Sequence, residues 1–307
     1  MALYLVTGGC GFIGSHLVDE LIRRGHLVRI LDDLSTGQLS NVPIGTEVIQ
    51  GDVADPETVA KAMQGADGCF HLAAVASVER GNLDWLGTHR TNLTGAIAVF
   101  DAAGRASRSG PVPVVYASSA AVYGDNPATP LGEEAATRPL SAYGADKLGC
   151  EQHALVAGRV HGVPTCGLRF FNVYGPRQDP TSPYSGVISI FCHRLKARQS
   201  LAVYGDGRQT RDFIFVHDVV RALLAAMAKT SLQGPVYNVC TGRPTAILDL
   251  VEVISGILGV RAEPSFLSPR LGEIRVSLGD ASRARRELDF EAQTDLRAGL
   301  TATLAAL

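Results

Sequence analysis

The first 170 residues alternate short apolar runs with longer segments in which apolar residues recur at helical spacing. The apolar runs have the length of β-strands and lie at 3–7, 27–31, 46–50, 68–72, 112–117 and 164–168. The helical segments lie between them, at 12–24, 56–64, 88–105 and 142–161. Strands that are buried on both faces are uniformly apolar, as these runs are. The alternation therefore predicts an α/β fold, in which helices cover both faces of a doubly wound parallel sheet.

The pattern loosens after about residue 170. Glycine, proline and polar residues crowd the stretches 174–186 and 204–212. Helical spacing returns at 187–198, 217–229 and 247–258, and one more strand is expected at 236–239. We therefore expect residues 1–170 to form the sheet domain, with segments near 212–240 returning to it. Residues 171–307 would mainly form a smaller C-terminal lobe.

Composition narrows the class of protein. The chain has 307 residues and a formal net charge of −2, which gives no electrostatic reason to expect nucleic acid or membrane binding. No apolar run approaches the roughly 20 residues that span a bilayer, and no signal peptide is evident. The six cysteines are scattered without metal-binding spacing, so we expect no metal site. A cytoplasmic enzyme is the expectation.

A glycine motif follows the first strand. Gly8, Gly11 and Gly14 form a GxxGxxG pattern at the start of the first helix. Glycine permits a tight turn and lets a pyrophosphate approach the helix N-terminus, where free N–H groups favour negative charge. This pattern predicts a Rossmann-type dinucleotide site, although a glycine-rich turn without a ligand is the alternative.

Two acids end the second strand. An acid at Asp32 can accept hydrogen bonds from the adenosine ribose hydroxyls. Asp33 follows it where an arginine would suit a 2′-phosphate, so we predict NAD as the cofactor rather than NADP.

A tyrosine and a lysine share one face of the helix expected at 142–161. Tyr143 and Lys147 are four residues apart, one turn of a helix. Tyrosine is a poor base at neutral pH because its phenol is almost fully protonated, but a fixed ammonium nearby stabilises the phenolate. Ser119 follows the fifth strand, at the edge of the sheet where ligands bind, and its hydroxyl can hydrogen-bond a reacting oxygen. Together they predict a catalytic set for hydride transfer.

These segments resemble the nucleotide-sugar epimerase/dehydratase branch of the extended short-chain dehydrogenases, most closely its UDP-glucose and UDP-N-acetylglucosamine 4-epimerases. The matching stretches run in order from TGGCGFIGSH through LDDLSTG, GDVAD, HLAA, ASSAAVYG, YGADK and LRFFNVYGPRQ to YGDGRQTRDFIFVHDV and PRLGE. The resemblance implies an NAD-dependent epimerase that acts on a UDP-sugar. It also implies a homodimer joined by a four-helix bundle, to which 88–105 and 142–161 would contribute.

The resemblance also implies site residues. The catalytic residues would be Ser119, Tyr143 and Lys147. NAD would contact Gly8, Gly11, Phe12, Ile13, Gly14, Asp32, Asp33, Ser35, Thr36, Gly37, Asp52, Val53, Leu72, Ala73, Ala74, Asn92, Tyr143 and Lys147. The substrate would contact Ser118, Ser119, Asn172, Tyr204, Arg211, Arg270 and Ser277. The two arginines would neutralise the diphosphate, because a guanidinium binds two oxygens at once, whereas a surface ion pair is the alternative for each.

The departures from the family pattern are informative. Related 4,6-dehydratases carry an Asp-Glu pair where this chain has Ala120 and Ala121, and decarboxylating relatives keep the Glu. Neither chemistry has its groups here, which leaves epimerisation at C4. Ser277 aligns with a position where a large tyrosine restricts some 4-epimerases to unacetylated sugars, so a small residue would admit an N-acetyl group. The segment 75–85, which would border the sugar, departs from the common version.

Two other functions remain open. A net oxidoreductase on the same sugars would exchange its cofactor with solvent. A non-catalytic sensor of the same fold would bind NAD without turnover, although it would have no need to keep Ser119, Tyr143 and Lys147.

Overall fold

The computed structural model describes residues 1–106, 110–180, 186–269 and 274–307. Its larger lobe is built on a seven-stranded parallel sheet with the strand order β10-β6-β5-β4-β1-β2-β3. The strands are β1 (Leu3–Thr7), β2 (Leu27–Asp32), β3 (Glu47–Gln50), β4 (Gly68–His71), β5 (Val114–Ser119), β6 (Thr165–Phe170) and β10 (Val236–Val239). The order reverses between β1 and β4, as in doubly wound folds, so the predicted fold class is confirmed.

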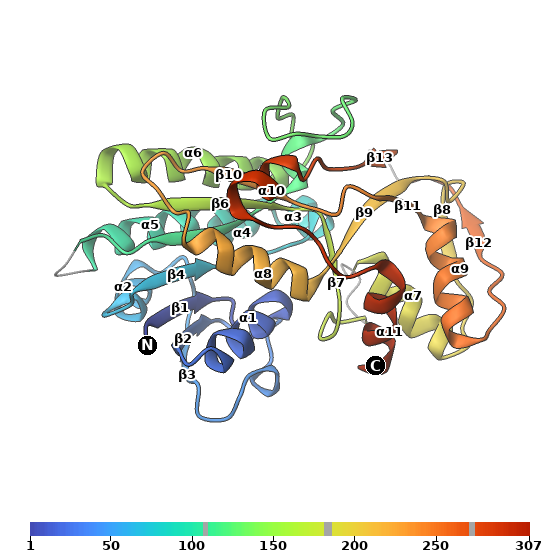
Figure 1. Cartoon of the computed structure of the whole chain (residues 1–307), viewed down its shortest axis with the longest axis horizontal. Helices are drawn as coiled ribbons and strands as arrows, with labels where there is room; N and C mark the ends of the chain where they lie inside the picture. The colour runs from blue at the N-terminus through green and yellow to red at the C-terminus, as the bar shows by residue number, and fades with distance from the viewer. Residues whose placement is uncertain (107–109, 181–185, 270–273) are drawn as a thin grey trace.

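Helices cover both faces of this sheet (Figure 1). On one face, α1 (Phe12–Arg23), α8 (Val216–Met227) and α10 (Ser282–Leu288) contribute to one hydrophobic core. On the other face, α2 (Pro56–Met63), α5 (Gly95–Arg105) and α6 (Ala142–His161) contribute to a second. The carboxyl ends of the strands, where the predicted catalytic residues lie, are thus left for the loops.

The smaller lobe has its own core, formed largely by α7 (Val187–Lys196), α9 (Ile247–Leu258), α11 (Leu296–Ala305) and β8 (Ala202–Tyr204). Its central strand, β9 (Thr210–Phe215), pairs with β7 (Asn172–Tyr174), β11 (Pro244–Ala246) and β13 (Val276–Ser277). A further strand, β12 (Ser265–Leu267), pairs with β8. Because β9 runs directly into α8, one continuous segment joins the two lobes (Figure 1).

The segment before α5 differs from the single helix expected at 88–105. It begins with α3 (Val78–Leu83) and α4 (Trp85–His89), and a π-helical turn, η2 (Arg90–Thr94), connects α4 to α5. The π turn holds Asn92 fully buried, with its side chain hydrogen-bonded to the backbone of Val75. Bulges of this kind are frequent at functional sites.

Candidate active site

The turn between β1 and α1 forms a tight cradle. Gly8 has a φ of +70°, and a Cβ there would lie 2.8 Å from the backbone nitrogen of Ala73. A Cβ on Gly14 would collide with the Gly8 carbonyl and lie 2.8 Å from the Gly9 Cα. Helix α1 begins after Gly11, which has no side chain to cap the first N–H groups of the helix. The cradle therefore fits the pyrophosphate of a dinucleotide.

The end of β2 supplies the acids beside this cradle. Asp32 is 6% exposed, and its two carboxylate oxygens accept hydrogen bonds from the Cys10 and Leu34 N–H groups, each at 2.9 Å. Burial raises the pKa of Asp32 because water is withdrawn from its charged form, although the two hydrogen bonds oppose this rise. Asp33 is linked to Ser35 through the Ser35 N–H and hydroxyl. The predicted residues Thr36 and Gly37 continue this loop.

The ends of β3 and β4 lie next to β2 and β1 in the sheet. Asp52 follows β3 and forms an ion pair with Arg90 at 3.0 Å, a partner that the sequence did not indicate. The Thr7 hydroxyl accepts hydrogen bonds from the Leu72 and Ala73 N–H groups at 3.2 Å, which brings the small residues after β4 close to the cradle. The predicted cofactor contacts Leu72, Ala73, Ala74, Asp52 and Val53 thus share the carboxyl edge of the sheet with Gly8 and Asp32.

Helix α6 carries the tyrosine and lysine. Ser141 caps it by accepting the Gly144 N–H at 3.1 Å. Lys147 is 2% exposed, donates from Nζ to the Ala117 carbonyl at 2.9 Å, and lies 5.9 Å from the centroid of the Tyr143 ring. The lysine therefore connects the helix directly to β5, the strand that ends at Ser119.

Ser119 lies at the carboxyl end of β5. Its hydroxyl accepts the Ala121 N–H at 3.1 Å and caps a short 3₁₀ turn, η3 (Ala120–Tyr123). Helix α6 approaches this turn so closely that a Cβ on Gly144 would lie 2.7 Å from the Ala121 carbonyl oxygen. Ser119, Tyr143 and Lys147 are thus brought together, and the two positions after the serine provide only methyl groups.

Three of the predicted substrate residues lie on β9 or on a strand that pairs with it. Asn172 is exposed at the start of β7, and Arg211 of β9 is in register with Ser277 of β13. The Arg211 guanidinium donates from Nη1 to the carbonyls of Thr210 at 2.9 Å and Ile274 at 2.8 Å. Tyr204 ends β8, and its carbonyl accepts a hydrogen bond from Gln209 at 2.8 Å. Arg270 lies outside the described residues.

Two predicted residues have structural partners already. The Ser118 hydroxyl is buried and donates a hydrogen bond to Glu151. The Asn92 side-chain amide is hydrogen-bonded to the backbone N–H and carbonyl of Val75. Their contacts with ligands stay predictions. Sequence reasoning did not identify Glu151 or its second partner, Arg169. The signal in the sequence was an acid four residues after Lys147, on the same face of the helix.

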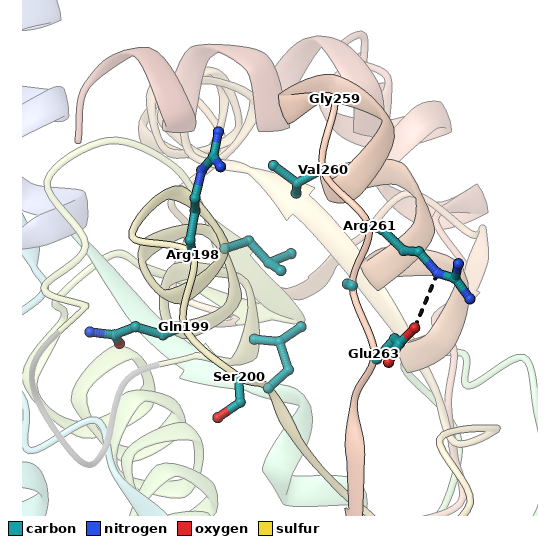
Figure 2. Close-up of a pocket in the computed structure, with 10 residues that line it drawn as sticks. Arg198, Gln199, Ser200, Gly259, Val260, Arg261 and Glu263 are labelled. Carbon is teal, nitrogen blue, oxygen red and sulfur yellow. Dashed lines mark ion pairs between the residues drawn. The ribbon is translucent and has the colours of Figure 1, made fainter.

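A cavity of about 450 Å³ lies elsewhere, between the C-terminal ends of α7 and α9 (Figure 2). Its lining includes Arg198, Arg261 and Glu263, and the last two form an ion pair at 3.1 Å. None of the predicted site residues lines it, so the candidate site stays at the edge of the large sheet.

Within the described ranges, no group of three or more His, Cys, Asp or Glu residues could hold a metal ion. No described helix has both the length and the apolarity to cross a bilayer.

Known proteins match this chain over nearly its full length. Residues 4–240 match the model of the NAD dependent epimerase/dehydratase family. The UDP-glucose 4-epimerase of Mycolicibacterium smegmatis is 38% identical, over 98% of this chain and 96% of that protein. A UDP-glucose 4-epimerase from Thermotoga maritima, solved with UDP-glucose, superposes with a TM-score of 0.94 at 34% identity, over 99% and 98% of the two chains. A UDP-N-acetylglucosamine 4-epimerase from Methanobrevibacter ruminantium, solved with UDP-N-acetylmuramic acid, gives 0.93 at 35% identity, over 99% and 97%.

Proposed function

The chain belongs to the NAD-dependent epimerase/dehydratase family, and on that premise we propose that it interconverts two UDP-hexoses that differ in configuration at C4. The family match confirms NAD as the predicted cofactor. The observation that carries the reaction is the placement of Lys147 between Tyr143 and the strand that ends at Ser119. Ala120 and Ala121 supply no acid or base, so the site suits hydride removal and return without water loss.

Each residue of the candidate site has a separate role in the proposed reaction. Tyr143 takes the proton of the sugar 4-hydroxyl, and Ser119 donates a hydrogen bond to the same oxygen. Lys147 stabilises the tyrosine anion with its positive charge. The glycine cradle and Asp32 would hold NAD, which when bound supplies a reversible hydride acceptor. The 4-keto sugar would turn over while Arg211 and Arg270 retain its diphosphate. Return of the hydride to the other face of C4, with return of the proton from Tyr143 to the 4-oxygen, would give the epimer.

Proton NMR of the purified protein with UDP-galactose, and separately with UDP-N-acetylgalactosamine, tests this proposal without added NAD. We expect the anomeric signal of either substrate to decline as that of its gluco partner grows. Tyr143→Phe should lower turnover by about 10²–10⁴-fold while retaining bound NAD, because it removes the proton acceptor alone. Tyr4→Phe, near the amino end of β1 and away from the carboxyl edge of the sheet, is the matched control and should keep full activity.

The other outcomes separate the alternatives. Full activity in Tyr143→Phe would contradict the assigned mechanism. A net change in nicotinamide absorbance equal to the sugar consumed would indicate an oxidoreductase. Bound NAD without conversion of either sugar would indicate a sensor or a different nucleotide sugar.

The second sugar pair has its own support. Ser277 is a small residue beside Arg211 in the β9–β13 pairing, and one of the similar solved structures is a UDP-N-acetylglucosamine 4-epimerase. We therefore extend the proposal to the N-acetylated pair. Ser277→Tyr should abolish conversion of UDP-N-acetylgalactosamine and spare UDP-galactose, because the added ring fills the space of the acetyl group. Equal losses for both sugars would remove Ser277 from this role.

The homodimer is also part of the proposal. The outward faces of α5 and α6 expose apolar side chains: Ile97 is 37%, Val156 46% and Val160 70% exposed. Two such helices from each subunit would form a four-helix bundle. Val160→Glu should convert the dimer to a monomer in analytical ultracentrifugation, whereas Ile44→Glu, at a fully exposed loop residue, should leave the dimer intact. A wild-type monomer would contradict the proposal.

We also propose that the protein is cytoplasmic. Its six cysteines are free and buried, as is usual in a reducing compartment.

A further inference from the structure

A buried ion pair lies behind the catalytic helix. Arg169 of β6 binds Glu151 of α6 with two parallel hydrogen bonds, from Nε to Oε1 at 2.9 Å and from Nη2 to Oε2 at 2.7 Å. Their side chains are only 7% and 5% exposed. Burial of two charges costs free energy of desolvation. This cost is offset only where the ion-pair geometry is good and the remaining polar atoms are hydrogen-bonded.

The third member of this group connects the pair to the catalytic strand. The Ser118 hydroxyl, 1% exposed as a residue, donates to Glu151 Oε1 at 2.5 Å. Ser118 immediately precedes Ser119 on β5, and Glu151 lies one turn after Lys147 on α6. One carboxylate thus joins the strand that carries the serine to the helix that carries the tyrosine and lysine.

Arg169 extends the network to the turn that follows Ser119. Its Nη1 donates to the Tyr123 hydroxyl at 2.8 Å and to the Glu133 carbonyl at 3.0 Å, and its guanidinium lies 4.8 Å from the centroid of the Tyr123 ring. Tyr123 belongs to η3 and donates onward to Asn238 at 2.7 Å. Burial disfavours the charged form of Arg169, but the hydrogen bonds and charge of Glu151 outweigh this and raise its pKa.

The same helix and strand meet at a second point. Lys147 Nζ donates to the Ala117 carbonyl, and Gly144 packs against Ala121 without room for a side chain. Helix α6 is therefore held against β5 and the turn after it near Tyr143, by Gly144 and Lys147, and again by Glu151 one turn after Lys147. Two fixed points determine the direction of a helix axis, whereas one would let it pivot.

We propose that Glu151 and Ser118 are positioning residues that hold Tyr143 and Lys147 at the correct distance from Ser119. This inference rests on the proposed function, because it assigns those three residues to the reaction. Neither Glu151 nor Arg169 needs to touch the sugar. A misplacement of about 1 Å in a catalytic group can reduce the rate about 100-fold, so a loosened helix acts on turnover more than on binding.

Ser118→Ala tests the link, because it leaves the Arg169–Glu151 pair in place. We expect kcat to fall at least about tenfold while KM changes less than about twofold and NAD content is unchanged. Ser118→Thr, which keeps the hydroxyl, should recover most of kcat. Glu151→Leu, which removes both acceptor oxygens, should reproduce the loss, and the double variant should be no slower than Glu151→Leu alone, because both substitutions remove the same Ser118–Glu151 hydrogen bond.

Asp218→Asn is the matched control. Asp218 is 1% exposed on α8 and accepts hydrogen bonds from Arg221 at 2.5 Å, Thr294 at 3.0 Å and Gln293 at 3.2 Å. It should lower the melting temperature at least as much as Ser118→Ala without changing kcat. Amide hydrogen exchange supplies a readout that needs no substrate: the two network variants should exchange faster over 117–123 and 142–151, and the control should not.

The outcomes keep the two proposals apart. Unchanged kcat in both network variants, in a wild-type enzyme that epimerises and needs Tyr143, would overturn the positioning role alone. Unchanged amide exchange at 117–123 and 142–151 would overturn it even if no substrate were found. A wild-type protein that fails to epimerise, with accelerated exchange in the variants, would overturn the proposed function and leave the network as the support of α6.

Discussion

Two glycines with the same backbone conformation allow the cofactor cradle to be tested by a single added methyl group. Gly8 has a φ of +70° and Gly65 a φ of +72°, so alanine at either position bears the same left-handed strain. They differ in surroundings. A Cβ at Gly8 would lie 2.8 Å from the Ala73 nitrogen and 2.9 Å from its Cα, whereas nothing lies within 4 Å of a Cβ at Gly65.

The structure sets the size of the two effects. The left-handed conformation costs alanine about 1–2 kcal/mol, which is the full expected effect of Gly65→Ala. At Gly8 the methyl group also meets backbone atoms that cannot rotate away, and overpacking of this kind costs about 1–3 kcal/mol more. At roughly 3 °C of melting temperature per kcal/mol, Gly8→Ala should melt about 3–9 °C below Gly65→Ala.

Thermal unfolding followed by circular dichroism measures the first difference, and the nicotinamide released on denaturation measures the second. We expect Gly65→Ala to retain bound NAD and Gly8→Ala to lose it, because relief of the clash displaces the loop from the residues after β4. Equal melting temperatures and equal NAD contents in the two variants would refute the close approach as the reason for glycine at position 8.

Three further predictions use other parts of the molecule. Burial, with a smaller effect of Lys147, lowers the pKa of His71 to about 3 from 6.5, so the unfolded chain takes up a proton that the folded one does not as the pH falls below 6.5. The free energy of unfolding, from urea titrations between about pH 6 and pH 5, should therefore fall about 1.2 kcal/mol per pH unit more steeply in the wild type than in His71→Asn; parallel slopes would contradict this. All six cysteines are buried, and burial raises the pKa of Cys10 to about 11, so a thiol reagent should react with them only after denaturation; rapid reaction of the native protein would contradict their burial. Asp212→Ala should lower the free energy of unfolding by about 3 kcal/mol or more, because the Thr241 N–H, the Thr241 hydroxyl and the Gly242 N–H would lose their acceptor. A loss below about 1 kcal/mol would show that these hydrogen bonds contribute little to stability.

The elements that the sequence predicted well carry their own end signals. Helix α6 begins and ends as expected because Ser141 caps its start and Gly162, at a φ of +68°, ends it. Helix α9 likewise stops at Gly259. The central strands are largely apolar, and their predicted bounds differ from the observed ones by at most two residues.

The elements that the sequence missed depend on distant partners. β9 is half polar (TRDFIF) and is a strand because β7, β11 and β13 pair with it from both sides. β13 has only two residues, too few for any periodicity. The same holds for the site: motifs identified Ser119, Tyr143 and Lys147, whereas the pairing of Glu151 with Arg169 depends on β6 lying beside β5.

The place of β10 in the large sheet affects how the protein is made. β10 is the edge strand next to β6, yet it is synthesised about 70 residues later, after β7, α7, β8 and β9 of the smaller lobe. At about 5–20 residues per second, a ribosome needs roughly 4–14 s to cover that distance. During this interval the growing chain exposes the unpaired edge of β6 and the apolar face that α8 later covers, and such edges pair readily with other chains. Nascent-chain protection by chaperones is therefore expected to matter most while residues 170–239 are synthesised, between the completion of β6 and that of β10.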